Sequence, residues 1–249
     1  MPSTEDPPHR TVERGRGATH NPANRFRRDL RERVDDIASD CDEPPPLATT
    51  VTIQRARTII AHNDSPDIPF DRSINPYQCC EHGCVYCYAR PSHAYLDLSP
   101  GLDFESRLFV KPDAPALLRA ELARPGYACR PMALGTNTDP YQPIERTWRA
   151  TRGVLEVLAE CEHPFTIVTK GALVERDLDI IAPMAAKNMA RVYLSVTTLD
   201  AELARRLEPR AASPRRRLRA MSALAAAGVP VGVMVAPVIP QLNDRDLEA

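Results

Sequence analysis

Three cysteines stand close together in one short stretch of the chain. Cys80, Cys84 and Cys87 are separated by gaps of three and two residues. This spacing lets a short loop bring three thiolates to one soft metal centre, as iron–sulfur clusters require. A cluster of four irons held by three cysteines leaves one iron without a protein ligand, and that iron can bind a reactant. The spacing therefore predicts a reactive iron–sulfur site rather than one that only carries electrons.

Two other interpretations of this stretch stay open with less support. A structural zinc ion usually takes four ligands in two spaced pairs. The second pair is missing, and His82, which is available as a fourth ligand, lies inside the loop. A disulfide is less expected still, because nothing marks the chain as secreted. Cys79 directly precedes Cys80, but only Cys80 gives the gap of three residues to Cys84, so Cys79 is interpreted as a spectator.

The size and composition of the chain favour one large domain. Its 249 residues can bury a single core, and its net charge of -1 gives no overall attraction to nucleic acid or to an anionic membrane. Seven cysteines, three of them in one loop, suit a reducing compartment. The first residues lack the basic start and apolar core of a signal peptide, and no run of 18 apolar residues occurs. We therefore expect a cytoplasmic monomer without a membrane span.

Residues 1–46 are expected to form a disordered arm, because they are rich in proline, arginine and acidic residues and poor in aliphatic ones. Four apolar residues of the arm recur at helical spacing and predict an amphipathic helix that docks on the body: Phe26, Leu30, Val34 and Ile37. Interleaved acidic residues favour a solvated tail over a patch that binds a polyanion. Residues 47–249 are expected to form the folded core.

From residue 47 onward, short apolar runs alternate with helical patterns. Residues 51–60 are expected to be extended, and strands are expected at 72–77, 131–135, 165–170, 192–197 and 231–236. Helices are expected after Cys87 and at 113–124, 143–162, 175–188 and 214–227. Nearly continuous apolar strands that alternate with helices are typical of a parallel sheet covered by helices. A partial α/β barrel with right-handed crossovers fits this order.

Polar clusters follow the ends of these strands, where the reactive face of an α/β barrel lies. They comprise Cys80 to Cys87, residues 136–139, Lys170, Thr197 with Thr198, and residues 237–243. This placement does not depend on the cysteine spacing. It is therefore an independent indication of one shared active site.

The motif Cys-x-x-x-Cys-x-Tyr-Cys-Tyr at residues 80–88 resembles that of the radical S-adenosylmethionine (SAM) superfamily. From about Gly15 onward the chain is similar to an uncharacterised bacterial family of that superfamily, close to spore photoproduct lyase. The other segments that carry this resemblance are Ser65-Pro66-Asp67, Asn75-Pro76-Tyr77, residues 135–145 and residues 236–240. The resemblance implies a (β/α)6 TIM-like barrel of the radical SAM type. Because five strands are counted against six in the family, a partial barrel, truncated before the last βα unit, is expected.

The resemblance also implies two cofactors and the residues that hold them. A 4Fe-4S cluster would be held by Cys80, Cys84 and Cys87, and SAM would chelate the open iron through its amine and carboxylate. Seven residues are expected to contact SAM: Tyr86 at the adenine, Thr138 and Asp139 at the amine, Lys170 at the carboxylate, Ser195 and Thr197 through their hydroxyls, and Arg217 through its charge. From the residues alone, Lys170 fits a solvent-facing lysine nearly as well.

The activity implied is reductive cleavage of SAM to a 5'-deoxyadenosyl radical that abstracts hydrogen from a substrate. The electron donor would be of the flavodoxin or ferredoxin type, and nucleic acid is a candidate substrate. Spore photoproduct lyases carry a hydrogen-donating cysteine in the turn after the second strand, but residues 135–139 contain none, so thymine-dimer reversal by that route is disfavoured. Gln241 also stands where glycine is usual.

Two alternatives to such an enzyme stay open. The first is a cluster-bearing protein that binds nucleic acid or regulates, with the arginines from Arg205 to Arg219 as its basic patch. The second is an inactive truncated product, predicted by the missing last strand.

Overall fold

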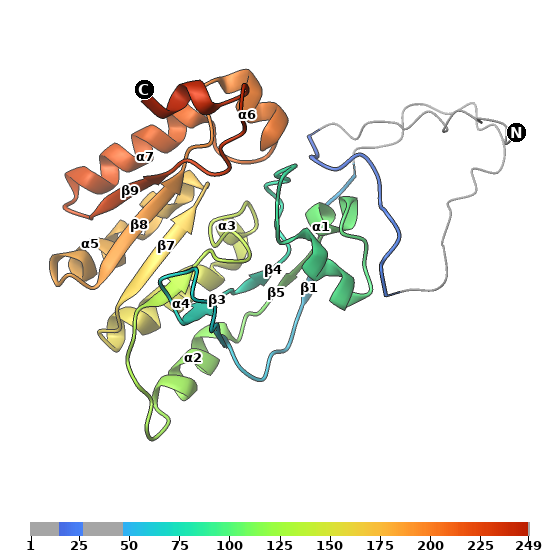
Figure 1. The fold of residues 1–249 in the computed structure, drawn as a ribbon. Coiled ribbons are helices and arrows are strands. Elements are labelled where there is room, and N and C mark those ends of the chain that lie inside the picture. Colours follow the sequence, from blue (N-terminus) through green and yellow to red (C-terminus); the bar gives the residue numbers. More distant parts are fainter. Residues whose placement is uncertain (1–14, 27–46, 249) are drawn as a thin grey trace, which may run out of the picture.

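The structure, a computed structural model, describes residues 15–26 and 47–248. The amphipathic helix predicted for the arm lies outside these residues, except for Phe26. Within these residues the larger sheet has six strands in the order β2-β3-β6-β7-β8-β9 (Figure 1). The strands are β2 (Ile60–His62), β3 (Arg72–Ile74), β6 (Met132–Leu134), β7 (Phe165–Thr169), β8 (Ala190–Ser195) and β9 (Val231–Met234). All except β2 run parallel to their neighbours. The predicted α/β fold with its five parallel strands is confirmed.

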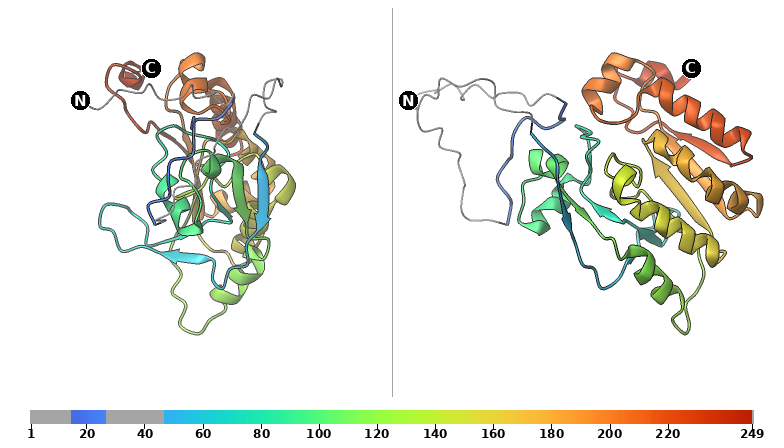
Figure 2. Two further views of the ribbon diagram at one scale, coloured as in Figure 1. Left: turned by 90° about the vertical axis from the view of Figure 1, so that its right-hand side faces the viewer. Right: turned by 180° about the vertical axis from the view of Figure 1, so that it is seen from behind.

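Each central strand places an aliphatic side chain in the core. Ile74, Leu134, Ile167 and Leu194 belong to four successive strands of the sheet and are fully buried. Four helices cover the sheet: α2 (Ala114–Leu122), α4 (Ala150–Glu160), α5 (Leu178–Ala186) and α7 (Pro214–Ala226). Seen from behind in the right-hand view of Figure 2, these helices lie side by side over the strands. Burial along the central strands β6, β7 and β8 explains their apolar residues, whereas the edge strand β9 leaves Val233 and Met234 exposed.

A second sheet, which the sequence did not predict, has strands on both sides of the cysteines in the chain. Its strands are β1 (Thr50–Ile53), β5 (Arg107–Val110) and β4 (Tyr77–Gln78), in the order β1-β5-β4. The helices η1 (Arg90–Leu96) and α1 (Leu102–Ser106) lie between β4 and β5 in the chain. Residues 51–60, expected as one extended run, are divided between β1 and β2 because the two strands join different sheets. The cysteine stretch therefore begins at the end of β4.

Two helices predicted as continuous are divided. Residues 143–162 form α3 (Glu145–Trp148) and α4, because Arg149 adopts a left-handed conformation with φ of 50°. The Glu145 carboxylate then accepts hydrogen bonds from the backbone N–H groups of Thr151 at 3.0 Å and Arg152 at 3.2 Å. It thereby caps the new helix start, where N–H groups otherwise lack partners. Residues 175–188 similarly divide into η2 (Ala172–Asp177) and α5.

The last helices of the chain are α6, α7 and η3. The predicted helix at 214–227 is confirmed as α7, and the Ser213 hydroxyl accepts a hydrogen bond from the Arg216 N–H as its cap. A short helix that the sequence did not predict, α6 (Ala201–Leu207), is capped by Asp200. Residues 244–248 form η3 (Asp244–Glu248). Among the helices described here, none is both long and apolar enough to cross a membrane.

Part of the expected arm, residues 15–26, lies against the folded body. The Asn24 side chain donates hydrogen bonds to the carbonyls of Ala94 at 3.0 Å and Leu98 at 3.2 Å. The Arg16 side chain is only 8% exposed and donates to the Glu105 carbonyl at 2.7 Å. Composition alone did not reveal this docking, because it depends on hydrogen bonds to residues about 70 to 90 positions away.

Candidate active site

The three cysteines of the motif lie on the loop between β4 and η1. Cys80 is buried, whereas Cys84 and Cys87 are half-buried, and none of the three forms a disulfide. The loop is fixed by hydrogen bonds from the Cys80 N–H to the Phe104 carbonyl at 3.3 Å and from the Cys87 N–H to the Cys84 carbonyl at 3.2 Å. The structure therefore offers three unpaired thiols on one ordered loop.

The electrostatics of these thiols suit a cationic centre. Burial raises the pKa of the Cys84 thiol to about 12, although the nearby charge of Lys170 acts in the opposite direction. Burial and then the charges of Asp139 and Cys84 raise the pKa of Cys80 well above its usual value. Bound iron removes this penalty, because a coordinating thiol is deprotonated by the metal. No three His, Cys, Asp or Glu side chains among the described residues group closely enough for a single metal ion. Thiolates are the ligands that iron–sulfur clusters take, so the chemical type of these three donors fits such a cluster.

The Cys79 side chain is in contact with His93. It is fully buried, with a positive φ of 72°, and its Sγ lies 2.6 Å from His93 Nδ1. It lies in an apolar cluster with Phe104 and Leu108. This contact supports the interpretation of Cys79 as a spectator.

His82, inside the cysteine loop, faces Asp139 on the loop after β6. The His82 Nδ1 and Asp139 Oδ2 atoms are 3.3 Å apart, and the His82 residue is 2% exposed. Asp139 also accepts hydrogen bonds from the Thr169 hydroxyl at 2.6 Å and the Lys170 N–H at 2.7 Å. Burial opposes ionisation of Asp139, but His82 and these donors hold its pKa below its usual value. The contacts join the cysteine loop to the ends of β6 and β7.

The Tyr86 side chain contacts the buried carboxylate of Glu208, which directly follows α6. Its hydroxyl donates to Glu208 and lies 3.0 Å from the Thr197 hydroxyl, which itself donates to Glu208 at 2.6 Å. Arg217 pairs with the second oxygen of Glu208 and donates to the Ser195 carbonyl at 2.7 Å. Burial opposes ionisation of Glu208, but Arg217 and Lys170 lower its pKa below the usual value. The sequence does not mark Glu208 as a site residue, because no local pattern encodes its burial.

Two further predicted SAM contacts differ in how free their side chains are. The Lys170 ammonium lies 5.8 Å from the centre of the Tyr86 ring, so it faces the cysteine loop. The Thr138 hydroxyl, by contrast, donates to the Tyr77 carbonyl at 3.1 Å, and the residue is 3% exposed. The structure thus gathers Tyr86, Lys170 and Thr197 around the loop. The roles of all seven residues toward SAM stay predictions.

Comparison with known proteins decides the family. The family model described as the Radical SAM superfamily matches residues 74–249. The chain belongs to the radical SAM superfamily. An uncharacterised protein of Mycobacterium tuberculosis is 45% identical to it over 177 residues, which cover 71% of this chain and 52% of that protein. An uncharacterised protein of Methanocaldococcus jannaschii is 27% identical over 171 residues, covering 69% and 61%. The chain spans about half the length of the M. tuberculosis relative.

Solved structures of spore photoproduct lyase share the fold of this radical SAM chain. The lyase complexed with a dinucleoside spore photoproduct matches with a TM-score of 0.58 at 19% identity, covering 77% of this chain and 52% of the lyase. A lyase variant with bound AdoMet and the same kind of ligand matches with a TM-score of 0.53 at 20% identity, covering 76% and 51%. The predicted fold of the radical SAM type is therefore confirmed, whereas the predicted truncation is not tested.

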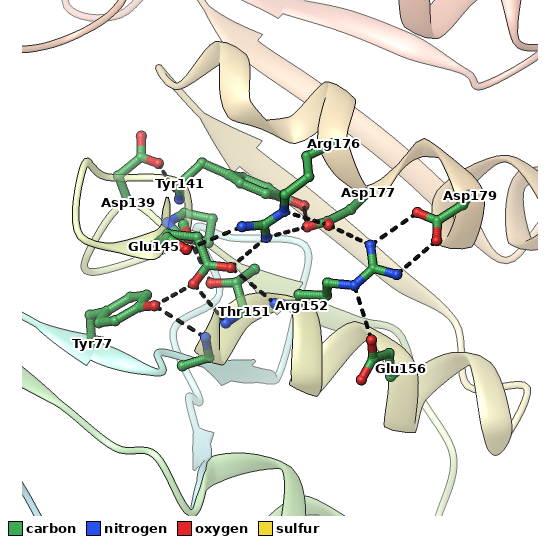
Figure 3. A network of polar contacts seen from close by, with 12 residues as sticks. Tyr77, Asp139, Tyr141, Glu145, Thr151, Arg152, Glu156, Arg176, Asp177 and Asp179 are labelled. Carbon is green, nitrogen blue, oxygen red and sulfur yellow. Dashed lines mark hydrogen bonds and ion pairs between the residues drawn. The ribbon is translucent and has the colours of Figure 1, made fainter. Parts of the chain in front are cut away.

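Behind the site of this radical SAM chain, a buried network fixes the loop at residues 139–145 (Figure 3). Glu145 accepts hydrogen bonds from the Tyr77 hydroxyl and, at 2.5 Å, from Arg176. Asp177 accepts from the Tyr141 hydroxyl at 3.1 Å and from Arg152 at 2.9 Å. Glu145 and Asp177 are both fully buried, so each carboxylate needs these donors in place of water. The network holds the loop that carries Asp139 at a fixed distance from β7.

Proposed function

We propose that this chain binds a 4Fe-4S cluster through Cys80, Cys84 and Cys87 and binds SAM at the iron that lacks a protein ligand. When bound, these groups supply one-electron cleavage of SAM to a radical that abstracts hydrogen from a substrate. The observation that supports this most directly is the presence of three unpaired, ordered thiols on the loop after β4 of a radical SAM chain. The electron would come from a flavodoxin or ferredoxin type of protein in a cytoplasmic setting.

The residues around the loop support a role in binding SAM. The Lys170 ammonium can pair with the SAM carboxylate, because a compact cation beside a partly buried site is a suitable anion partner. The Tyr86 ring offers an apolar face for the adenine, and Glu208 fixes the ring through its hydroxyl. Asp139 remains ionised at neutral pH, as its lowered pKa requires, and can accept a hydrogen bond from the SAM amine. These side chains position SAM and limit its contact with water.

Nucleic acid is the substrate class that the structure favours. Residues 200–227 contain seven arginines and three acidic residues, in a chain whose net charge is -1. Exposed arginines of this segment that have no carboxylate partner among the described residues are Arg205, Arg206, Arg215 and Arg219. The segment adjoins the cysteine loop, because the Val85 N–H donates to the Leu207 carbonyl at 3.0 Å and the Arg210 N–H to the His82 carbonyl at 3.2 Å. A phosphate backbone on this surface would lie beside the proposed cluster.

Reconstitution under anaerobic conditions tests the enzyme. The protein should take up about four irons and four sulfides per chain, as a 4Fe-4S cluster requires, and release 5'-deoxyadenosine from SAM under dithionite. Cys84→Ala should abolish both, whereas Cys129→Ala, at an exposed cysteine, should leave both unchanged. A colourless protein, or one with tetrahedral zinc, would contradict the proposal.

A cluster-bearing binding protein is the second candidate, and the exposed arginines of α6 and α7 favour it. It predicts iron uptake and salt-sensitive retention of DNA or RNA, but no cleavage of SAM. Retention should fall in a variant that combines Arg205→Ala and Arg219→Ala. Full-length relatives should be measured in parallel, because this chain corresponds to about half of their length.

A further inference from the structure

The N-terminal segment touches the cysteine loop at a point where no side chain fits. A Cβ atom on Gly17 would lie 1.8 Å from the carbonyl oxygen of Gly83. Gly83 itself has a φ of 68°, and a Cβ on it would lie 2.8 Å from Oε2 of Glu105. Two glycines therefore let two backbone segments meet at very short range. The contact lies on the peptide that joins Gly83 to Cys84.

Glu105 connects this contact to the loop by hydrogen bonds. Its carboxylate accepts from the N–H groups of Gly17 and Ala18, each at 2.8 Å, and from Arg90 at 2.5 Å. Glu105 is fully buried, so these donors replace the water that an ionised carboxylate requires. Arg90 in turn donates to the Cys84 carbonyl at 2.9 Å from the same Nη2 atom. A continuous set of contacts therefore runs from Gly17 to the second cysteine of the motif.

Arg16 anchors the same segment on its other side. The guanidinium donates to the Leu47 carbonyl at 2.8 Å and to the Thr49 hydroxyl at 2.9 Å, in addition to its bond with the Glu105 carbonyl. The Thr49 hydroxyl then donates at 2.6 Å to Glu81, which lies between Cys80 and Cys84. The cysteine loop is thus held from two directions, through Glu81 and through Arg90.

We propose that residues 16–18, here called the brace, hold the cysteine loop in the conformation that receives the cluster, with Gly17 and Glu105 as positioning residues. The proposal rests on the proposed function, because it concerns the same three thiols. Without the brace, Glu105 loses two of its three donors and the peptide between Gly83 and Cys84 opens to water. The loop then samples conformations in which Cys84 and Cys87 are exposed.

Alkylation of the full chain, reduced and free of metal, tests the brace without any measurement of activity. Gly17→Ala and Glu105→Gln are compared with the wild type and with Thr19→Ala, an exposed residue of the same segment. The rate of labelling by iodoacetamide is followed at each cysteine by peptide mass spectrometry. Cys129 and Cys161, both exposed, serve as references within each sample.

We expect Cys84 and Cys87 to react at least about tenfold faster in both brace variants. This corresponds to a fall of about 1.4 kcal/mol in the free energy of opening the cysteine loop. The reference cysteines and Thr19→Ala should match the wild type. Unchanged rates at Cys84 and Cys87 in both variants would overturn the proposal. Labelling of Cys79 that rises in step with Cys84 would indicate general unfolding and would also overturn it, because Cys79 is fully buried and takes no part in the hydrogen bonds of the brace.

Anaerobic reconstitution gives an independent readout. Iron and sulfide content should fall in the two brace variants and stay at the wild-type level in Thr19→Ala, while all four proteins melt cooperatively. Wild-type iron content in both brace variants would contradict the brace. A wild-type chain that takes up no iron would instead refute the proposed function, and the alkylation rates would still decide whether the brace holds the loop.

Discussion

Glu208 and Arg217 form an ion pair whose side chains are 1% and 2% exposed. Glu208 also accepts hydrogen bonds from Tyr86 and Thr197, and Arg217 donates to the Ser195 carbonyl. The pair therefore connects the cysteine loop, β8 and α7. Because both charges are almost out of reach of water, each depends on the other for compensation.

Replacement of Arg217 should therefore be costly. Arg217→Met leaves the Glu208 carboxylate buried without its partner, and we expect the free energy of unfolding to fall by about 3–5 kcal/mol. Urea denaturation measures this change. The matched control is Arg216→Met on the same helix, whose ion pair with Glu175 is partly exposed and which should cost less than about 1 kcal/mol. Equal losses in the two variants would show that the buried Glu208–Arg217 pair contributes no more to stability than the exposed pair.

The hydroxyl of Tyr77 should contribute measurably to stability. It donates to Glu145 and accepts a hydrogen bond from the Ala150 N–H at 3.2 Å, in a residue that is 1% exposed. Tyr77→Phe removes it and leaves a buried N–H group without an acceptor, so we expect a loss of about 1–3 kcal/mol. Tyr95→Phe, at a residue that is 73% exposed, should stay within about 0.5 kcal/mol of the wild type. Thermal melts with calorimetry distinguish the two, and a neutral Tyr77→Phe would argue against the network of Figure 3.

Removal of the Lys170 ammonium should weaken SAM binding. A charge-assisted hydrogen bond is worth about 1.5–3 kcal/mol, which corresponds to a rise in Kd of about 10-fold to 150-fold for Lys170→Ala. Titration of SAM into the anaerobically reconstituted protein measures the Kd. Lys187→Ala is the control, because Lys187 forms an exposed ion pair with Glu162. If both variants bind SAM as the wild type does, Lys170 does not contact the carboxylate.

Asp71 should make stability depend on pH in the acid range. Its pKa is lowered to about 2, chiefly by the hydrogen bond from Arg72, with a further contribution from Arg130. A lowered folded pKa means that the stabilisation is complete above the unfolded value of about 3.9 and disappears as pH falls through the folded value. The difference in urea midpoint between wild type and Asp71→Asn should therefore be constant above about pH 5 and shrink toward pH 2. A constant difference between wild type and Asp71→Asn from about pH 5 to about pH 2 would contradict the assignment.

The sequence by itself determined the family and the central sheet. The spacing of Cys80, Cys84 and Cys87 predicted a cluster loop, and the runs that became β3, β6, β7, β8 and β9 were recognisable from their apolar or extended pattern between helical stretches. The Ser213 cap and the helix after it were equally visible, since capping depends on neighbouring residues.

Only the tertiary structure decided which distant residues hold that loop. The roles of Glu208, Glu105 and residues 16–18 arise from contacts between segments up to about 120 positions apart, which no local pattern encodes. The break at Arg149 was not predicted either: the Glu145 carboxylate that caps the start of α4 is close in sequence, but distant residues, Tyr77 and Arg176, hold it in place. Local sequence sets which groups can do the chemistry; long-range burial and hydrogen bonding set where those groups stand.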